Sequence, residues 1–487
     1  SDADTDTGST STGDTGTDAC APDPTLSVTA STSPGPLPNQ LLVTVDTSAA
    51  ATIAVVCVND GDATDAHLLE STTPATHHEL KLMGLLSASE YTCKAAATCP
   101  TTGLAAATVH ASTSAPPIQF AVLDVDVDPQ LGMTGAYTMA PWQPNVLSRG
   151  YIVVWGPDGR ARWWYRLEEG VGIDIEALLD PGATTVVYGG GDNPAGAPSI
   201  VDLWDGLIYK ATMPVWGQDQ YTHDTKRIWD GRILSLQYVP NSRGTRSWLG
   251  FGVRLHDPAT GVIDWEFASQ RYVDEGILPP GNGEPYHANW IDYIDTPSGP
   301  VLYVSLYQLQ HIMAIDGVTG DLLWDLHAGA GWTVLDENGN PLPDGDLPQG
   351  QHGLEVDGDV LWVYDNGTNR LHSRAEKWRI DGVNQIATRE WMWTEQGWFE
   401  PILGDIDILA NGDRALITQA TIGCCFHPTD FVEVELSSGR VASRMSMPAD
   451  AMVGYRSQRY DGCDMFANIG LCAPLQQRAT ELQPLFQ

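Results

Sequence analysis

The sequence predicts an all-β protein in which a small immunoglobulin-like or fibronectin III-like β-sandwich precedes a six-bladed β-propeller. Three stretches, which begin at His223, His287 and His352, repeat one design: a histidine, an alternating apolar run, a tight polar turn and a second strand. Alternation with period two on both sides of such a turn is typical of a β-hairpin. Three further copies have another polar residue in the place of the histidine, namely Asp174, Asp405 and Arg456. Six copies spaced roughly 50 to 65 residues apart indicate six blades.

The first segment, residues 1–21, consists mostly of Ser, Thr, Asp and Gly, so it cannot bury apolar surface and is predicted to be a solvated tail of the disordered type. It resembles the start of a mature exported chain. We therefore expect a periplasmic, cell-surface or extracellular protein, with a removed signal peptide or a lipid-tethered N-terminus as alternatives for what precedes Ser1.

The charge of the chain narrows the class of partners. It carries 62 acidic against 25 basic residues, a formal net charge of −37. Such an excess of negative charge excludes nucleic acid and anionic membrane surfaces as expected partners. No apolar run of about 18 residues or more is present, so no membrane span is predicted.

Residues 22–115 are predicted to form the sandwich. Residues 41–45 and 53–58 have the composition of short, partly buried strands. Tyr91 stands where such folds keep a corner tyrosine that bonds back to the backbone. A short stiff linker, Ser114-Ala-Pro-Pro, then leads into the propeller, residues 117–487.

The eight cysteines divide evenly between the two predicted domains. Even numbers in an exported chain favour disulfides within each domain, while the connectivity stays open. The first group is Cys20, Cys57, Cys93 and Cys99, and the second is Cys424, Cys425, Cys463 and Cys472.

A tryptophan repeat supports the blades. Trp163, Trp265 and Trp324 each stand four residues after a turn glycine. This spacing fits an outer strand whose tryptophan packs between blades.

Since equivalent inner-strand positions of a propeller converge on its central channel, the three repeated histidines are expected to share one pocket.

Several motifs resemble those of the bacterial aryl sulfotransferases. These motifs are His223-Asp with Asp-Gly-Arg-Ile-Leu, His287-Ala-Asn289, Thr319-Gly-Asp-Leu-Leu-Trp, and Gln-His352 followed by Asp-Asn366-Gly and Ser373-Arg374. The resemblance covers roughly residues 120 to 470. It implies a six-bladed propeller that moves a sulfuryl group from an aryl sulfate to a phenol without a nucleotide donor, a metal or another cofactor.

The resemblance also implies roles for individual residues. His352 matches the histidine that becomes transiently sulfated. His223 and His287 match catalytic donors to the sulfuryl oxygens or to the departing phenolate, and Asn289 matches a substrate-binding donor. Asp365 and Asn366 are expected to shape the hairpin and to support His352.

One position departs from the family pattern. The family has an arginine after the serine of the third inner strand, whereas this chain has Tyr307 after Ser305. Tyr307 offers a hydrogen bond but no permanent charge. The nearest cations by repeat position are Arg456 and Arg374, which we expect in the substrate pocket.

Two other classes of function stay open at this point. The first is a non-catalytic extracellular propeller that binds a ligand or assembles with itself through its tail or its sandwich. The second is a metal-dependent or quinone-dependent propeller enzyme, since three convergent imidazoles are suitable metal ligands. His256, His311, His327, His372 and His427 have no family context and are expected to be structural or solvated, and no residue is assigned as a metal ligand.

Overall fold

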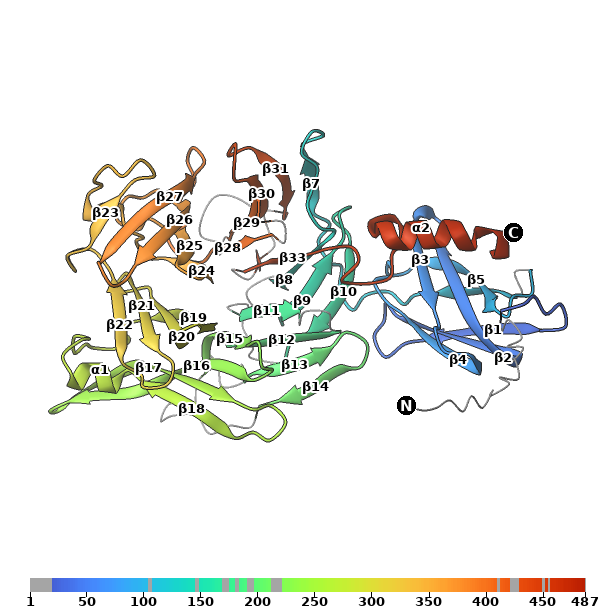
Figure 1. The fold of residues 1–487 in the computed structure, drawn as a ribbon, viewed down its shortest axis with the longest axis horizontal. Helices are drawn as coiled ribbons and strands as arrows, with labels where there is room; N and C mark the ends of the chain where they lie inside the picture. The colour runs from blue at the N-terminus through green and yellow to red at the C-terminus, as the bar shows by residue number, and fades with distance from the viewer. Residues whose placement is uncertain are drawn as a thin grey trace, which may run out of the picture.

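The computed structural model describes the chain from Cys20 to Phe486. Outside the description lie residues 1–19, 104–106, 145–148, 169–174, 180–183, 191–196, 212–220, 410–411, 421–428, 449–451, 454–455 and 487. The predicted tail, Asp174, Cys424 and Cys425 therefore fall wholly or mostly outside it. The ordered elements are nearly all strands, which confirms the all-β class, and they form two units (Figure 1).

The N-terminal unit has two sheets that share one long strand. Its strands are β1 (Val28–Pro34), β2 (Leu41–Asn59), β3 (Asp62–Glu70), β4 (Ala75–Leu82), β5 (Glu90–Cys99) and β6 (Ala107–Ser112). The first half of β2 pairs with β1 and β4, and its second half pairs with β3 and β5, while β6 pairs with β5. Val43 and Val45 from the first half share a core with Ile53 and Val55 from the second. The backbone N–H of Leu86 donates to the hydroxyl of the buried Tyr91 at 2.9 Å.

The disulfides confirm the prediction for six of the eight cysteines. Cys57 and Cys93 stand directly opposite each other on β2 and β5 and are bonded. The other two bonds join cysteines of the same half of the chain, Cys20 with Cys99 and Cys463 with Cys472.

The strands from residue 124 onward form six sheets within the described part of the chain. The first contains β8 (Tyr137–Gln143), β9 (Tyr151–Trp155) and β10 (Ala161–Arg166). The second contains β11 (Ile175–Leu179), β12 (Thr185–Gly190), β13 (Ser199–Asp202) and β14 (Gly206–Lys210). The third contains β15 (Tyr221–Arg227), β16 (Ile233–Arg243), β17 (Arg246–His256) and β18 (Ile263–Ala268), and the short helix α1 (Gln270–Asp274) follows it.

The remaining three sheets continue the series. The fourth contains β19 (Ala288–Thr296), β20 (Gly299–Leu306), β21 (His311–Asp316) and β22 (Leu322–Leu326). The fifth contains β24 (His352–Asp357), β25 (Val360–Asp365), β26 (Arg374–Asp381) and β27 (Ile386–Trp393), with β23 (Thr333–Leu335) at its edge and the 3₁₀ turn η1 (Asp344–Asp346) before it. The sixth contains β28 (Asp405–Ile408), β29 (Arg414–Gln419), β30 (Asp430–Glu435) and β31 (Val441–Ser446).

The two ends of this region join its first and last sheets, as in a β-propeller. β7 (Asp124–Val127), from the start of the region, pairs with β31 of the sixth sheet (Figure 1). From the other end, β32 (Met452–Val453) and β33 (Gln458–Tyr460) pair with β8 of the first sheet. The leading strands β15, β19, β24 and β28 contact one another in succession, so residues at their starts lie near a common centre.

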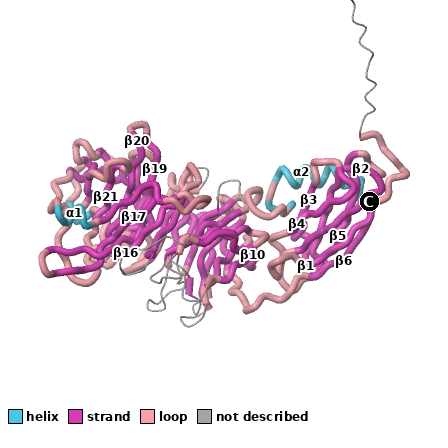
Figure 2. Tube along the Cα trace, turned by 90° about the horizontal axis from the view of Figure 1, so that it is seen from below, coloured by secondary structure: helices cyan, strands magenta, loops and turns pink. Residues whose placement is uncertain are grey.

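The C-terminal segment leaves the propeller and returns to the N-terminal unit. It comprises η2 (Ile469–Leu471), α2 (Ala473–Leu482) and η3 (Gln483–Phe486), and α2 lies over the unit that contains β3 and β5 (Figures 1 and 2). Leu482 and Phe486 are buried against Leu68 and Ala96. The last residues of the range predicted for the propeller, residues 117–487, thus pack against a sheet of the N-terminal unit.

A buried ion pair also links the two units. Arg162 of β10 donates to the carboxylate of Asp65 on β3 at 2.7 Å, and the Tyr91 hydroxyl donates to the other oxygen of this carboxylate. The Arg162 charge and the bonds to His67 and Tyr91 outweigh the effect of burial and hold the pKa of Asp65 well below its usual range. Since both charges are removed from water, each requires the other.

Candidate functional site

The three repeated histidines lie in three successive sheets, each close to the point where the pairing between the first two strands is interrupted. His223 lies within β15, His287 directly precedes β19, and His352 opens β24. At each of these places the register between the first two strands shifts, as at a β-bulge. Bulges change the direction of a side chain and are frequent beside active sites.

The backbone at two of these histidines is strained. The φ angle is +42° at His223 and +47° at His287. A non-glycine residue in this left-handed region costs about 1–3 kcal/mol, and such residues cluster at functional sites. In the third copy Gly353 has the positive φ instead, and a Cβ atom there would lie 2.1 Å from Asp405. Three sheets thus use an unusual backbone to aim the same side chain.

The rings of these side chains form a continuous series. The ring centroids of His223 and His287 are 4.6 Å apart, those of His287 and Tyr307 are 5.4 Å apart, and those of Tyr307 and His352 are 5.0 Å apart. His223 and His352 are buried, whereas the side chain of His287 is 25% exposed. The structure therefore brings the three predicted catalytic histidines together, with His287 on the solvent side.

Asn366 fixes the protonation of one nitrogen of His352. The Asn366 amide nitrogen donates to the backbone carbonyls of Glu400 and Leu403, so its oxygen faces the His352 Nδ1 atom at 2.8 Å. Nδ1 must then be the donor, and in the neutral ring the lone pair is on Nε2. Asp365 accepts from the backbone N–H groups of Gln349 and Gly367, which stabilises the turn that carries Asn366.

Burial keeps two of the imidazoles neutral. Burial lowers the pKa of His352 to about 3; hydrogen bonding to Asn366 and, in the protonated ring, to the Gly350 carbonyl opposes the shift, and the charges of His287 and Arg456 add to it. Burial likewise lowers the pKa of His223 well below its ordinary value, and the same two charges and His352 act in the same direction. At neutral pH both rings are therefore unprotonated nucleophiles or hydrogen-bonding groups.

Arg456 is the cation of this cluster. Its guanidinium donates to Asp224 Oδ1 at 2.9 Å and to the Asn289 carbonyl at 2.7 Å. The side chains of Arg456 and Asp224 are 1% and 0% exposed. Asp224 also accepts from the backbone N–H of Ile291. A buried charge that is felt at both His223 and His352 thus stands where the sequence placed a candidate substrate-binding arginine.

Three other predicted substrate-binding residues have structural contacts in the chain itself. The Asn289 side chain donates to the backbone carbonyl of Gln351 at 2.8 Å and so positions the residue before His352. The Tyr307 hydroxyl donates to the carbonyl of Pro401 at 3.0 Å, so Tyr307 contributes its ring face to the cluster. Arg374 lies beside Asp346 and Glu376, at 3.5 Å from each carboxylate, so its ion pairs among the described residues are with these acids and not with the histidine cluster.

The sequence interpretation missed three acidic residues around the cluster. Glu284 Oε1 lies 3.0 Å from the His287 Nδ1 atom and also accepts from the Tyr238 hydroxyl. Asp224 pairs with Arg456, and its position directly after a repeated histidine was an available signal. Glu400 is buried beside the Asn366 turn, and burial raises its pKa to about 8.

The three pocket histidines are not the group of described side chains whose possible metal-ligand atoms lie closest together. Among the described residues, the group of His, Cys, Asp or Glu side chains whose ligand atoms lie within 4.8 Å of one another is His311, Asp325 and His327. The cysteine pair that favoured a quinone enzyme, Cys424 and Cys425, lies outside the described residues.

The low pKa of His352 predicts a specific acid sensitivity. Between pH 6.5 and about 3 the unfolded chain binds a proton at this imidazole, whereas the folded chain does not, so stability falls as the pH falls. The expected slope is about 1.4 kcal/mol for each pH unit in this window. His352→Ala should flatten the dependence of the urea midpoint on pH between 7 and 4. His77→Ala, at an exposed histidine whose pKa is raised by Asp46, should leave the slope unchanged below about pH 5.5, where His77 is protonated in both the folded and the unfolded chain. Equal slopes in all three proteins would contradict a neutral His352.

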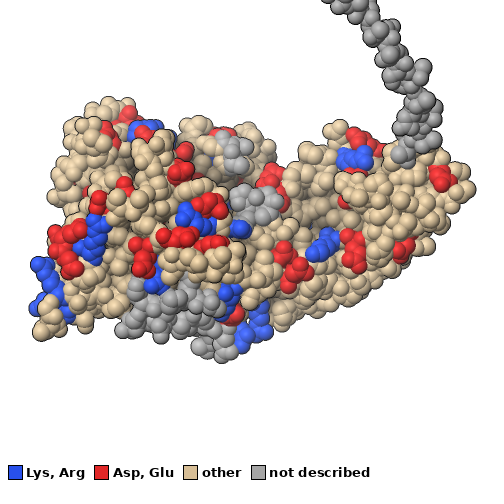
Figure 3. Space-filling model, turned by 60° about the horizontal axis from the view of Figure 1, so that its bottom comes forward, with Lys and Arg blue, Asp and Glu red and all other residues tan. Residues whose placement is uncertain are grey.

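The distribution of surface charge agrees with the expectation, based on net charge, that nucleic acid and anionic membranes are not partners. On the face in Figure 3, acidic and basic side chains lie in small mixed groups and form no continuous basic patch. No helix in the described part of the chain is long and apolar enough to cross a membrane.

The solved structures named below are distant from this chain in sequence. No protein-family model matches the sequence, and no curated protein matches it. The chain is similar to the structure of a putative 6-phosphogluconolactonase from Bacteroides uniformis at 11% identity and a TM-score of 0.37, over 83% of this chain and 99% of that one. It is similar to the β-propeller domain of Cps50 (Swd1) from Myceliophteria thermophila at 11% identity and a TM-score of 0.37, over 67% and 87% of the two chains. AztD from Citrobacter koseri is similar at 11% identity and a TM-score of 0.28, over 84% and 99%. Scores this low carry no argument, so the β-propeller rests on the strand topology described above.

Proposed function

We propose that the chain is a nucleotide-independent aryl sulfotransferase that transfers a sulfuryl group through a sulfohistidine at His352. The observation that carries the proposal is the state of this residue: a buried neutral imidazole whose Nδ1 atom is held as a donor by Asn366. The resemblance of the surrounding motifs to the aryl sulfotransferases supplies the reaction class. The charges of His287 and of the buried Arg456 act on this imidazole, and His223 lies beside His287.

In the first step, Nε2 of His352 attacks the sulfur of an aryl sulfate. The new N–S bond forms as the bond from sulfur to the aryl oxygen breaks, and the electron pair leaves with the phenolate. The imidazole gains positive charge, which the carbonyl oxygen of Asn366 stabilises through Nδ1–H. The Arg456 charge and a hydrogen bond from His223 stabilise the sulfuryl oxygens.

His287 is assigned the proton transfer in both steps. Its Nδ1 atom lies 3.0 Å from Glu284 Oε1, so the carboxylate can pair with the ring during proton transfer, and the partial exposure of His287 places it where a phenol can enter. It protonates the departing phenolate in the first step. In the second step it removes the proton of the acceptor phenol, whose oxygen attacks sulfur and frees His352.

The test is a turnover assay on the whole chain with a direct search for the intermediate. Incubation with 4-nitrophenyl sulfate should release 4-nitrophenol, faster when an acceptor phenol is present. Rapid quenching at neutral to alkaline pH should give a peptide that contains His352 with the added mass of a sulfuryl group. Absence of both turnover and the modified peptide would exclude the proposal.

A ligand-binding propeller without catalysis is the second candidate. The specific observation in its favour is that Asp224 neutralises Arg456, so the pocket has little net positive charge for a sulfate ester. Binding of a phenol or an aryl sulfate without turnover would support it. Self-association through the tail or the N-terminal unit belongs to the same candidate.

We also propose a fibronectin III-like identity for the N-terminal unit and an exported location. Three strands on one side and four on the other, with β2 shared by both sheets, support the first assignment. Three disulfides support the second.

A further inference from the structure

A second group of side chains lies on the fourth sheet, apart from the series of rings around His352. In the hairpin of β21 and β22, Ile312 stands opposite Leu326 and Met313 stands opposite Asp325. One step further along the same register, His311 and His327 face each other. Asp325 and His327 are two residues apart, so all three side chains are on one face of the hairpin.

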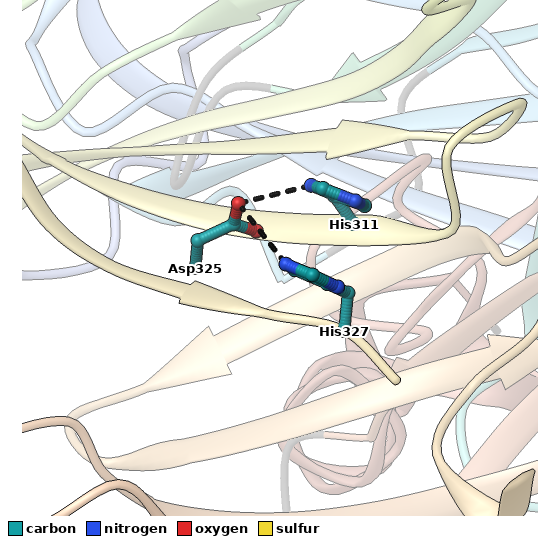
Figure 4. A group of neighbouring side chains, drawn as sticks. All are labelled: His311, Asp325 and His327. Carbon is teal, nitrogen blue, oxygen red and sulfur yellow. Dashed lines mark hydrogen bonds and ion pairs between the residues drawn. The ribbon is translucent and has the colours of Figure 1, made fainter. Parts of the chain in front are cut away.

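The three side chains converge on one point (Figure 4). His311 Nδ1 lies 2.9 Å from Asp325 Oδ2, and His327 Nε2 lies 3.7 Å from the same oxygen. The two imidazole rings are stacked, with centroids 3.8 Å apart and planes 3° from parallel. One ligand atom from each residue can be chosen so that all of them lie within 4.8 Å of one another.

The hydrogen bond of His327 and the surroundings of Asp325 place electron-rich atoms where the three side chains meet. His327 Nδ1 lies 2.9 Å from the Ala328 carbonyl and therefore donates to it, so in the neutral ring the lone pair on Nε2 faces the carboxylate. The other oxygen of Asp325, Oδ1, is buried and accepts no hydrogen bond from the described residues. No ion pair joins Asp325 to a lysine or arginine in the part of the chain that the structure describes. A carboxylate in such surroundings favours a cation.

We infer that His311, Asp325 and His327 form a binding site for a divalent transition-metal ion of the zinc class. Two imidazole nitrogens and one carboxylate oxygen suit Zn²⁺, Co²⁺, Ni²⁺ or Cu²⁺, whereas Mg²⁺ and Ca²⁺ prefer oxygen ligands alone. Three protein ligands leave the fourth tetrahedral position to water or to another ligand.

Metal binding requires only a small adjustment of the side chains. Zinc binds imidazole nitrogen and carboxylate oxygen at about 2.1 Å, which brings the ligand atoms to roughly 3.5 Å from one another. His327 follows the end of β22 and its side chain is 27% exposed, so it can move by this amount without disturbing the core.

The inference does not depend on the sulfotransferase proposal. The backbone of His311 accepts a hydrogen bond from the Gln351 side chain, so the two sites are neighbours, but none of the three metal ligands is assigned a role at His352. Direct binding measurements therefore decide the metal site whether or not the protein turns over aryl sulfates.

The test uses the full chain without an affinity tag, freed of metal by a chelator and then dialysed. Titration with Co²⁺ should reach saturation at one ion for each chain, with visible absorption bands typical of a four-coordinate ion, and Zn²⁺ should displace it. His327→Ala and Asp325→Asn should each weaken Zn²⁺ binding at least tenfold. Zn²⁺ should also raise the thermal midpoint of the parent protein but not that of the variants.

His77→Ala is the matched control. His77 also lies between two carboxylates, but Asp46 faces its Nδ1 atom and Glu79 faces its Nε2 atom, so the three cannot bind one ion. This variant should bind Zn²⁺ like the parent protein. Unchanged Zn²⁺ affinity in His327→Ala, with a circular dichroism spectrum that shows it is folded, would overturn the inference even if Asp325→Asn failed to fold.

Discussion

His352→Ala is expected to lower the turnover of 4-nitrophenyl sulfate by at least about a thousandfold, because it removes the atom that forms the bond to sulfur. Loss of a nucleophile lowers kcat, whereas loss of a residue that only binds substrate raises KM. The side chain is buried, so the substitution also leaves a cavity of the size of an imidazole ring. Steady-state kinetics with and without an acceptor phenol would measure the effect.

Two controls separate loss of the nucleophile from loss of the fold. Added imidazole should occupy the cavity and restore part of the turnover of His352→Ala. His372→Ala removes another histidine before β26, one that pairs with the Thr394 hydroxyl and contacts none of the pocket rings that the structure describes. It should keep parental activity. Full activity in His352→Ala would contradict the proposed mechanism.

Arg456→Leu is expected to have the second large effect, and on two quantities at once. The substitution leaves the Asp224 carboxylate buried without its cation, which should cost about 3–5 kcal/mol of unfolding free energy. It also removes the positive charge near the sulfuryl oxygens, which should lower kcat roughly a hundredfold or more. Chemical unfolding and aryl sulfate turnover would measure the two effects separately.

The double variant Arg456→Leu with Asp224→Asn distinguishes these roles. Neutralising Asp224 removes the unpaired buried charge, so the double variant should regain part of the lost stability. It should not regain turnover, because the positive charge is still absent. Recovery of both quantities together would mean that Arg456 acts only on the fold.

Much of the fold could be predicted from the sequence, because strand alternation is local. Each repeated run, such as the one after His352, shows which residues point to one face without any knowledge of the neighbouring sheet. The repeat spacing also shows that equivalent residues meet at the centre, and the 4.6 Å between the rings of His223 and His287 agrees with that prediction. The C-terminal helix could not be assigned in this way, since only its packing against Leu68 and Ala96 shows which unit it covers.

The candidate site also contains features that the sequence predicts and features that depend on the tertiary structure. The sequence by itself determined which residue types lead the repeats and hence that His223, His287 and His352 are neighbours. Only the tertiary structure decided which charges reach them: Arg456 pairs with Asp224, 232 residues away, whereas Arg374 pairs with Asp346 and Glu376. The physical reason is that the apolar periodicity of the sequence reports only on the local backbone around each residue. The partner of a long charged side chain depends on the register and closure of the whole propeller.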